Sequence, residues 1–171
     1  MDRGHQLLGV VHGTKAFLPH LVERGEGWIV NVSSVFGIIA FPSQAAYNAT
    51  KFAVRGFTEC LRQELAGTGV TAISVHPGGI KTNIARRGRF RDSHDGTRDK
   101  ETVVDEFDRI ARTSPEDAAL TILRGMERRE PRVLIGADAR LIDTVQRLLP
   151  VRYPSFLGAM ADRMRGKSRS S

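Results

Sequence analysis

The sequence has few of the features that mark secreted or membrane-spanning proteins. Its single cysteine, Cys60, cannot form a disulfide within the chain, which suits a reducing compartment. No apolar run approaches the roughly 20 residues of a membrane-spanning helix, and residues 1–5 lack the basic and then apolar order of a secretory signal. We therefore expect a soluble, cytoplasmic protein with no membrane span. Cys60, at an apolar position of a predicted helix, is expected to pack in the protein core.

Aromatic residues are also scarce, at 6%, although the formal net charge is +7. The basic residues gather in two polar stretches, 86–91 and 163–169, and no nucleic-acid-binding motif accompanies them. With few aromatic side chains on which bases could stack, a nucleic-acid partner is not expected. We interpret the two stretches as a solvated loop and tail; a phosphate-bearing ligand is the alternative.

Apolar periodicity predicts an alternation of helices and strands in one domain of 171 residues. Short apolar runs predict strands at 28–32, 70–75 and 132–135, the first of them covered on both faces. Helical spacing predicts helices over 7–24, 44–66 and 141–149, with a weaker one over 154–164. Ser114-Pro115-Glu116-Asp117 is typical of a helix start, with serine as the cap. The chain is therefore predicted to be an α/β protein.

Three residues have the chemistry of an acid/base site. Tyr47 and Lys51 are four positions apart and share one face of the predicted helix. An ammonium beside a phenol favours the phenolate and lowers the phenol's pKa towards the neutral range. Ser34 follows the strand 28–32, and the carboxyl ends of strands are where ligands bind in open α/β sheets. A serine pair in a turn would not by itself indicate a functional site. Ser34 is interpreted as a site residue because Tyr47 and Lys51 accompany it.

Three motifs in order, Asn31-Val32-Ser33-Ser34, Tyr47-x-x-x-Lys51 and Pro77-Gly78-Gly79-Ile80-Lys81-Thr82, resemble those of the short-chain dehydrogenase/reductase (SDR) family. Residues 9–19 also resemble the family's fourth helix. The resemblance implies a partial Rossmann-like, doubly wound parallel sheet, made of the last three strands side by side with flanking helices. Strand 28–32 would then lie at an unpaired edge.

The resemblance also implies a function. Tyr47 would be the acid/base of a reaction that interconverts a small alcohol and a carbonyl, Lys51 would hold the nicotinamide ribose, and Ser34 would bind the substrate oxygen. The cofactor would be NAD or NADP, contacted by Tyr47, Lys51, Pro77, Gly78, Ile80 and Thr82, with no metal. Residues 7–84 would form the catalytic core, 85–113 a substrate loop, 114–165 the carboxyl-terminal helices and last strand, and 166–171 a tail. The helices over 7–24 and 44–66 would pair in a homo-oligomer.

The chain departs from the family's pattern at its amino end. No glycine-rich pyrophosphate turn occurs in the sequence, and Gln6 stands where the family has an asparagine. We therefore expect an amino-terminally truncated SDR domain. The alternative is a catalytically silent fragment that acts only through self-association or a partner. His12 and His76 are interpreted as structural or surface histidines.

Overall fold

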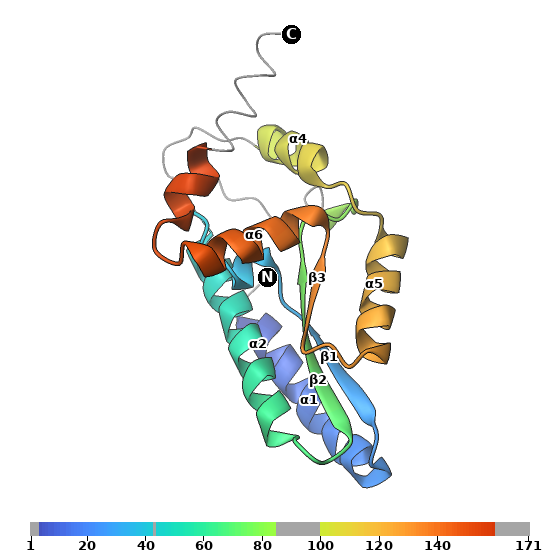
Figure 1. The fold of residues 1–171 in the computed structure, drawn as a ribbon. Coiled ribbons are helices and arrows are strands. Elements are labelled where there is room, and N and C mark those ends of the chain that lie inside the picture. Colours follow the sequence, from blue (N-terminus) through green and yellow to red (C-terminus); the bar gives the residue numbers. More distant parts are fainter. Residues whose placement is uncertain (1–3, 43, 85–99, 160–171) are drawn as a thin grey trace.

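A parallel sheet organises the fold. The structure, a computed structural model, describes residues 4–42, 44–84 and 100–159. Its strands are β1 (Gly27–Val32), β2 (Val70–Pro77) and β3 (Arg132–Ile135), which form a three-stranded sheet in the order β1-β2-β3. Both pairings are parallel, with Val32 opposite Val75 and His76 opposite Leu134. This confirms the predicted α/β class and the position of β1 at an edge of the sheet (Figure 1).

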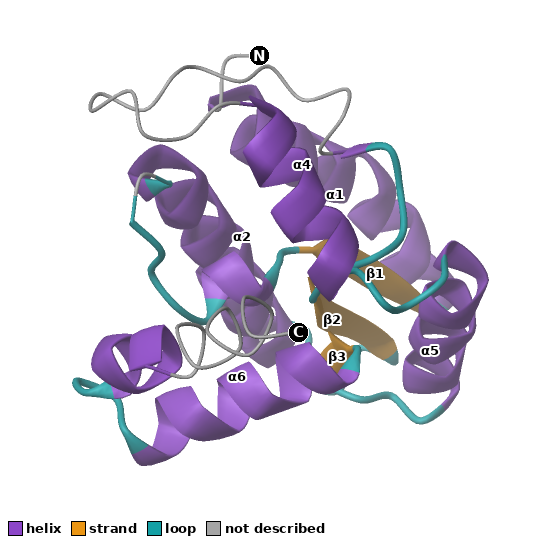
Figure 2. Cartoon of the chain, turned by 90° about the horizontal axis from the view of Figure 1, so that it is seen from above, coloured by secondary structure: helices purple, strands orange, loops and turns teal. Residues whose placement is uncertain are grey.

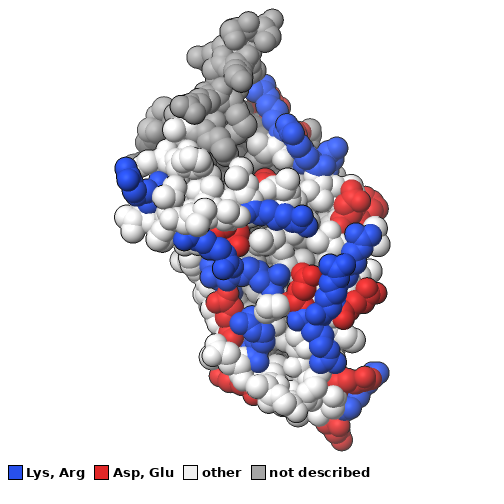
Figure 3. Space-filling view, viewed as in Figure 1, with Lys and Arg blue, Asp and Glu red and all other residues white. Residues whose placement is uncertain are grey.

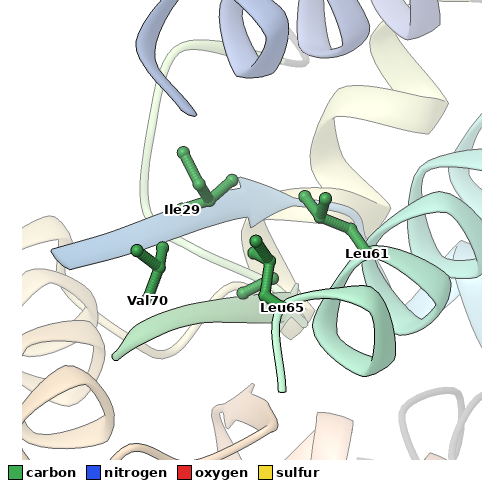
Figure 4. Close-up of a cluster of buried hydrophobic side chains, with 5 residues drawn as sticks. Ile29, Leu61, Leu65 and Val70 are labelled. Atoms are coloured by element: carbon green, nitrogen blue, oxygen red, sulfur yellow. The ribbon is translucent and has the colours of Figure 1, made fainter. Parts of the chain in front are cut away.

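Two helices cover one face of the sheet. Helix α1 (Gly4–Arg24) packs against β1, and α2 (Ala45–Glu64) packs chiefly against β2. The buried cluster between them contains Ile29, Leu61, Leu65, Val70 and Ala72. Figure 4 shows Ile29 and Val70 of the strands near Leu61 and Leu65 of the α2 region. The cluster lies towards the amino ends of the strands and packs α2 against the sheet.

The opposite face is covered by α5 (Pro115–Glu127). The Ser114 hydroxyl accepts from the Asp117 amide at 3.0 Å, which confirms the predicted cap. A second buried cluster joins this helix to the sheet through Ile73, Val75, Ala118, Val133 and Ile135. Figure 2 shows the strands between α5 and α2.

Strand β1 is buried on one face and only partly covered on the other, where Val30 packs against the second cluster, so its predicted burial on both faces holds only in part. Trp28 and Val32 point to the other face and are 40% and 48% exposed. The Trp28 indole still donates a hydrogen bond to the Met126 carbonyl at 2.9 Å. Because α5 packs mainly on β3 and β2, it covers this face of β1 only in part.

The carboxyl-terminal half differs in detail from the prediction. Within the expected substrate loop 85–113, residues 100–110 form helix α4 (Lys100–Ile110); residues 85–99 lie outside the described part. Helix α6 (Ala137–Leu148) begins four residues before the predicted start, because Gly136 at φ +96° turns the chain directly out of β3. Residues 153–159 are also helical, and the predicted tail 166–171 is outside the described residues. Cys60 was expected in the core but is exposed on α2 beside Glu64.

A chain of ion pairs joins α2 to β3 and α6. Glu59 on α2 accepts from Arg132 at 2.7 Å and from Arg55 at 3.0 Å. Arg132 also donates to Asp143 at 2.8 Å, and Asp143 accepts from Arg147 at 2.7 Å. Burial opposes ionisation of Glu59, but the hydrogen bonds from the two arginines outweigh burial and lower its pKa. Acidic and basic side chains also alternate over the face in Figure 3.

Among the described helices, none is long and apolar enough to cross a membrane.

Candidate active site

The predicted site residues come together at the carboxyl edge of β1 and β2. The two strands are parallel and in register, so the segments that follow Val32 and Pro77 leave the sheet at the same edge. Ser34 lies just beyond β1, and the loop 77–82 lies beyond β2. Ligands of open α/β sheets bind outside this edge, so the topology places both segments where a substrate and cofactor could meet.

Ser34, Tyr47 and Lys51 form one connected group. Tyr47 and Lys51 are one turn apart on α2, and the Lys51 Nζ lies 5.6 Å from the centre of the Tyr47 ring. The same Nζ donates to the Val32 carbonyl at 3.0 Å. The Ser34 side chain lies close enough to the Tyr47 phenol to lower its pKa, and its Oγ accepts from the Phe36 amide at 3.2 Å. The Phe36 amide thus holds the serine side chain beside the phenol.

The pKa of Tyr47 differs from the direction expected from its spacing to Lys51. Burial raises the pKa of Tyr47, and the Ser34 hydrogen bond opposes this rise only in part. Burial also lowers the pKa of Lys51, whose ammonium is bound to the Val32 carbonyl instead of the phenol oxygen. The phenol in this structure is therefore protonated at neutral pH and is a potential proton donor.

Aromatic rings form a wall beside the phenol. Phe36 meets Tyr47 edge to face at 5.9 Å between ring centres, and Phe36 stacks on Phe41 at 5.4 Å. The loop that carries both phenylalanines is held by Asn48, whose Nδ2 donates to the Phe36 and Ile39 carbonyls at 2.9 and 2.7 Å. Its Oδ1 accepts from the Phe41 amide at 3.2 Å. One buried asparagine therefore holds the loop against the helix that bears Tyr47.

Asn48 and Ser33 lie inside the quoted motifs but were not predicted to have a role. The Ser33 hydroxyl donates to the Lys51 carbonyl at 2.8 Å and so joins the end of β1 to α2. Gly37 packs so closely on these two residues that a Cβ there would overlap Ser33 and the Lys51 backbone. Asn48 is a polar residue one position from the apolar stripe of its helix. Because buried polar groups need hydrogen-bond partners, this position could have indicated a structural role for its side chain.

The loop 77–82 is held from two sides. The Gly78 amide donates to the Ile135 carbonyl at 3.0 Å, and the Gly79 amide donates to Asp138 Oδ2 at 2.7 Å. The Lys81 amide donates to the Thr113 carbonyl at 2.9 Å, and Ile80 forms a parallel bridge with Thr113. Gly79 faces the backbone of residues 110–111 without room for a Cβ.

Other predicted residues have different surroundings. Thr82 is exposed, with its hydroxyl beside the Ile84 amide, and is free to meet a ligand. His12 is exposed, whereas His76 is fully buried. Within the described ranges, no group of three or more His, Cys, Asp or Glu side chains could hold a metal ion.

Comparisons with known proteins agree with this geometry. The family described as "short chain dehydrogenase" matches residues 5–91, just over half of the chain. The chain is 49% identical over 154 residues to a Mycobacterium tuberculosis protein named "Putative oxidoreductase SadH", a match that covers 88% of this chain and 54% of that protein. It is 35% identical over 159 residues to the Xenopus tropicalis protein named "Dehydrogenase/reductase SDR family member 7B", covering 92% and 49% respectively. The chain thus spans about half the length of these relatives.

Solved structures show the same likeness. A short-chain dehydrogenase from Streptomyces avermitilis superposes with a TM-score of 0.70 at 28% identity, over 92% of this chain and 59% of that one. A short-chain dehydrogenase from Burkholderia cenocepacia, in complex with NADP, gives a TM-score of 0.67 at 27% identity, over 85% and 53%. With the three motifs gathered at one edge of a Rossmann-like sheet, the chain belongs to the short-chain dehydrogenase family.

Proposed function

We propose that this chain is the catalytic and carboxyl-terminal part of an NAD(P)-dependent oxidoreductase that interconverts an alcohol and a carbonyl. The observation that carries the proposal is the connected group of Ser34, Tyr47 and Lys51 at the carboxyl edge of the sheet. A half-buried phenol with a serine hydroxyl beside it and a lysine one turn away can exchange a proton with a substrate oxygen. The substrate class is a small molecule, because the aromatic wall of Phe36 and Phe41 lies directly beside the phenol.

Each residue of the group has a distinct task in this proposal. Tyr47 gives its proton to the carbonyl oxygen during reduction and takes it back during oxidation. Ser34 donates a hydrogen bond to the same oxygen, where negative charge develops in the transition state. Lys51 has three N–H donors, so its ammonium can bind ribose hydroxyls while one N–H still donates to the Val32 carbonyl. Its positive charge then favours the phenolate that forms when Tyr47 has lost its proton.

The residues present fit the nicotinamide end of a dinucleotide. The loop 77–82 offers backbone groups at Ile80 and an exposed hydroxyl at Thr82, while its glycines allow Asp138 and residues 110–111 to pack closely on the loop. Pro77 and Gly78 begin this loop, and Lys51 lies on the neighbouring helix. When bound, the dinucleotide supplies or accepts the hydride. The NADP in the Burkholderia cenocepacia relative supports a dinucleotide of this kind, NAD or NADP.

A second candidate is a catalytically silent chain that acts through self-association or a partner. The half-exposed Trp28 and Val32 on the unpaired edge β1 favour it, because such an edge can pair with another strand. In this case no saturable dinucleotide binding is expected.

Titration with NADH and NADPH, with fluorescence and particle mass followed together, separates the two candidates. Saturable binding supports the oxidoreductase, and absence of binding by a well-folded chain supports the silent alternative. In a form that turns over, Tyr47→Phe should abolish activity, because it removes the proton and leaves the ring in place. Tyr153→Phe alters the only other tyrosine and is the matched control; it removes the bond that the Tyr153 hydroxyl accepts from the Ala40 amide at 2.9 Å but leaves Ser34, Tyr47 and Lys51 unaltered. Retained activity in Tyr47→Phe would refute the assigned role.

A further inference from the structure

His76 is a buried side chain that the proposed reaction does not use. It lies on β2 immediately before Pro77, and its exposed fraction is 0%. Both ring nitrogens have partners: Nδ1 lies 2.9 Å from the Ser34 carbonyl oxygen, and Nε2 lies 2.9 Å from the Ser74 Oγ. The ring therefore links the interior of β2 to the backbone of the candidate catalytic serine.

The partners determine where the ring proton lies. A carbonyl oxygen can only accept, so Nδ1 must carry the hydrogen that is donated to Ser34. In a neutral imidazole the other nitrogen is then an acceptor, and the Ser74 hydroxyl donates to it.

The ring is neutral at physiological pH. Burial is the main cause that lowers the pKa of His76, to about 4. The Ser34 carbonyl opposes this shift; among the charged groups around the ring, Arg132 and Arg55 favour the neutral form and Glu59 favours the cation. The Nδ1–H tautomer is thus the form expected at neutral pH.

His76 belongs to a polar layer between the sheet and α2. Asn31, opposite Ser74 in the sheet, donates to the Thr58 hydroxyl of α2 at 3.0 Å. Further towards the amino ends of the strands, the same interface is apolar, with Ile29, Val70 and Ala72. Buried polar groups cost free energy unless each is paired, so a core built only for stability would continue the apolar layer. The layer becomes polar directly beneath the candidate site.

The Ser34 carbonyl has a second donor, the Gly37 amide at 2.9 Å, which belongs to the turn after β1. This bond keeps the turn closed but does not connect it to the sheet. The regular ladder ends one residue earlier, where the Ser33 amide donates to the Val75 carbonyl at 2.8 Å. The His76 ring is therefore the connection that fixes Ser34 relative to β2.

We propose that His76 is a positioning residue that holds the Ser34 carbonyl through Nδ1–H and thereby keeps the Ser34 hydroxyl aimed at the Tyr47 phenol. Ser74 acts on the same ring by donating to Nε2. The catalytic consequence rests on the proposed function, but the hydrogen-bond geometry does not.

The first test needs no substitution and no activity. Nuclear magnetic resonance of isotope-labelled histidine in the intact chain should show His76 as the neutral Nδ1–H tautomer at neutral pH. The Nε2–H tautomer or a charged ring would overturn the proposal, because neither leaves the described pair of bonds with Ser34 and Ser74.

The second test follows the phenol in chains labelled at tyrosine Cζ, whose resonance responds to hydrogen bonding at the oxygen. His76→Leu should displace the Tyr47 resonance in the same direction as Ser34→Ala. His76→Asn, whose amide can donate near the former Nδ1 position, should restore most of the wild-type shift. Adding His76→Leu to Ser34→Ala should cause no further change, since the histidine acts through the serine. An unchanged resonance in His76→Leu, or a full additional shift in the double variant, would overturn the proposal.

In a form that turns over, His76→Leu should lower kcat by about tenfold to a hundredfold, the scale expected for a misplaced catalytic group. The KM for the dinucleotide should stay unchanged, and His76→Asn should recover most of the rate. If the wild type has no turnover while the tautomer and the phenol resonance behave as stated, the proposed function fails and the positioning role of His76 stands. If the wild type turns over and His76→Leu keeps full kcat, the positioning role fails.

Discussion

Asn48 should be a large single contributor to the stability of the site, and Asn48→Ala tests this. The side chain is 5% exposed and makes three hydrogen bonds to the backbone of the 36–41 loop. Each such bond contributes about 1 kcal/mol net, and a buried group left without a partner costs about 1–3 kcal/mol. The Ile39 carbonyl belongs to a residue only 4% exposed, whereas the exposed Phe41 can recover water at its amide. The expected loss is therefore about 2–4 kcal/mol.

Urea unfolding, followed by circular dichroism, measures this loss. With a slope of about 2 kcal/mol per molar urea, the midpoint should fall by about 1–2 M. Asn48→Asp should lose more than Asn48→Ala, because a carboxylate oxygen would face the Phe36 and Ile39 carbonyls that now accept from Nδ2. The exposed Asn83→Ala is the control and should stay within about 0.5 kcal/mol. A wild-type midpoint in Asn48→Ala would refute the reasoning.

Three further predictions concern other parts of the molecule. The lowered pKa of Glu59 stabilises the fold above the ordinary carboxyl range, and this contribution is lost as pH falls through the lowered pKa. The acid-induced fall in urea midpoint should therefore be smaller in Glu59→Gln. If the chain binds NADH or NADPH, Asp138→Ala should weaken binding by about tenfold, because it removes one hydrogen bond to the Gly79 amide. Asp138→Asn should weaken binding less. Equal affinity of the wild type and both variants would contradict this prediction. If α1 mediates a homo-oligomer, Phe17→Ser, which replaces a side chain 66% exposed, should lower the mass in sedimentation, and Leu120→Ser on α5 should not.

The strands and their order were predictable because their signals are local and strong. The run from Trp28 to Val32 is short, apolar and β-branched, and Ser114 with Asp117 forms a cap that needs no tertiary partner. Helix α4 was missed because charged residues dominate its sequence. The exposure of Cys60 and of one face of β1 depends on which helix covers which surface, and periodicity alone cannot determine that.

The candidate site was predictable in its reactive groups but less so in the groups that hold them. The spacing of Tyr47 and Lys51 on α2 is fixed by helix geometry, and Ser34 lies beside Tyr47; the catalytic roles of the three residues stay predictions. Asp138 contacts Gly79 across 59 positions of sequence, and His76 contacts Ser34 across 42. Such distant contacts leave no periodic signal in one sequence. The raised pKa of Tyr47 was also unexpected, because it depends on burial as well as on the nearby charge.

Trp28 gives the bare edge of β1 an optical signal. It is the chain's only tryptophan, so all indole emission comes from a ring that is 40% exposed and tied by its nitrogen to α5. A strand that docks beside β1 would move this ring from water into an apolar contact, and its emission would shift to the blue. Separation of β1 from α5 would break the bond to Met126 and shift the emission to the red. The colour of the emitted light would therefore distinguish completion of the sheet from its opening, without any added label.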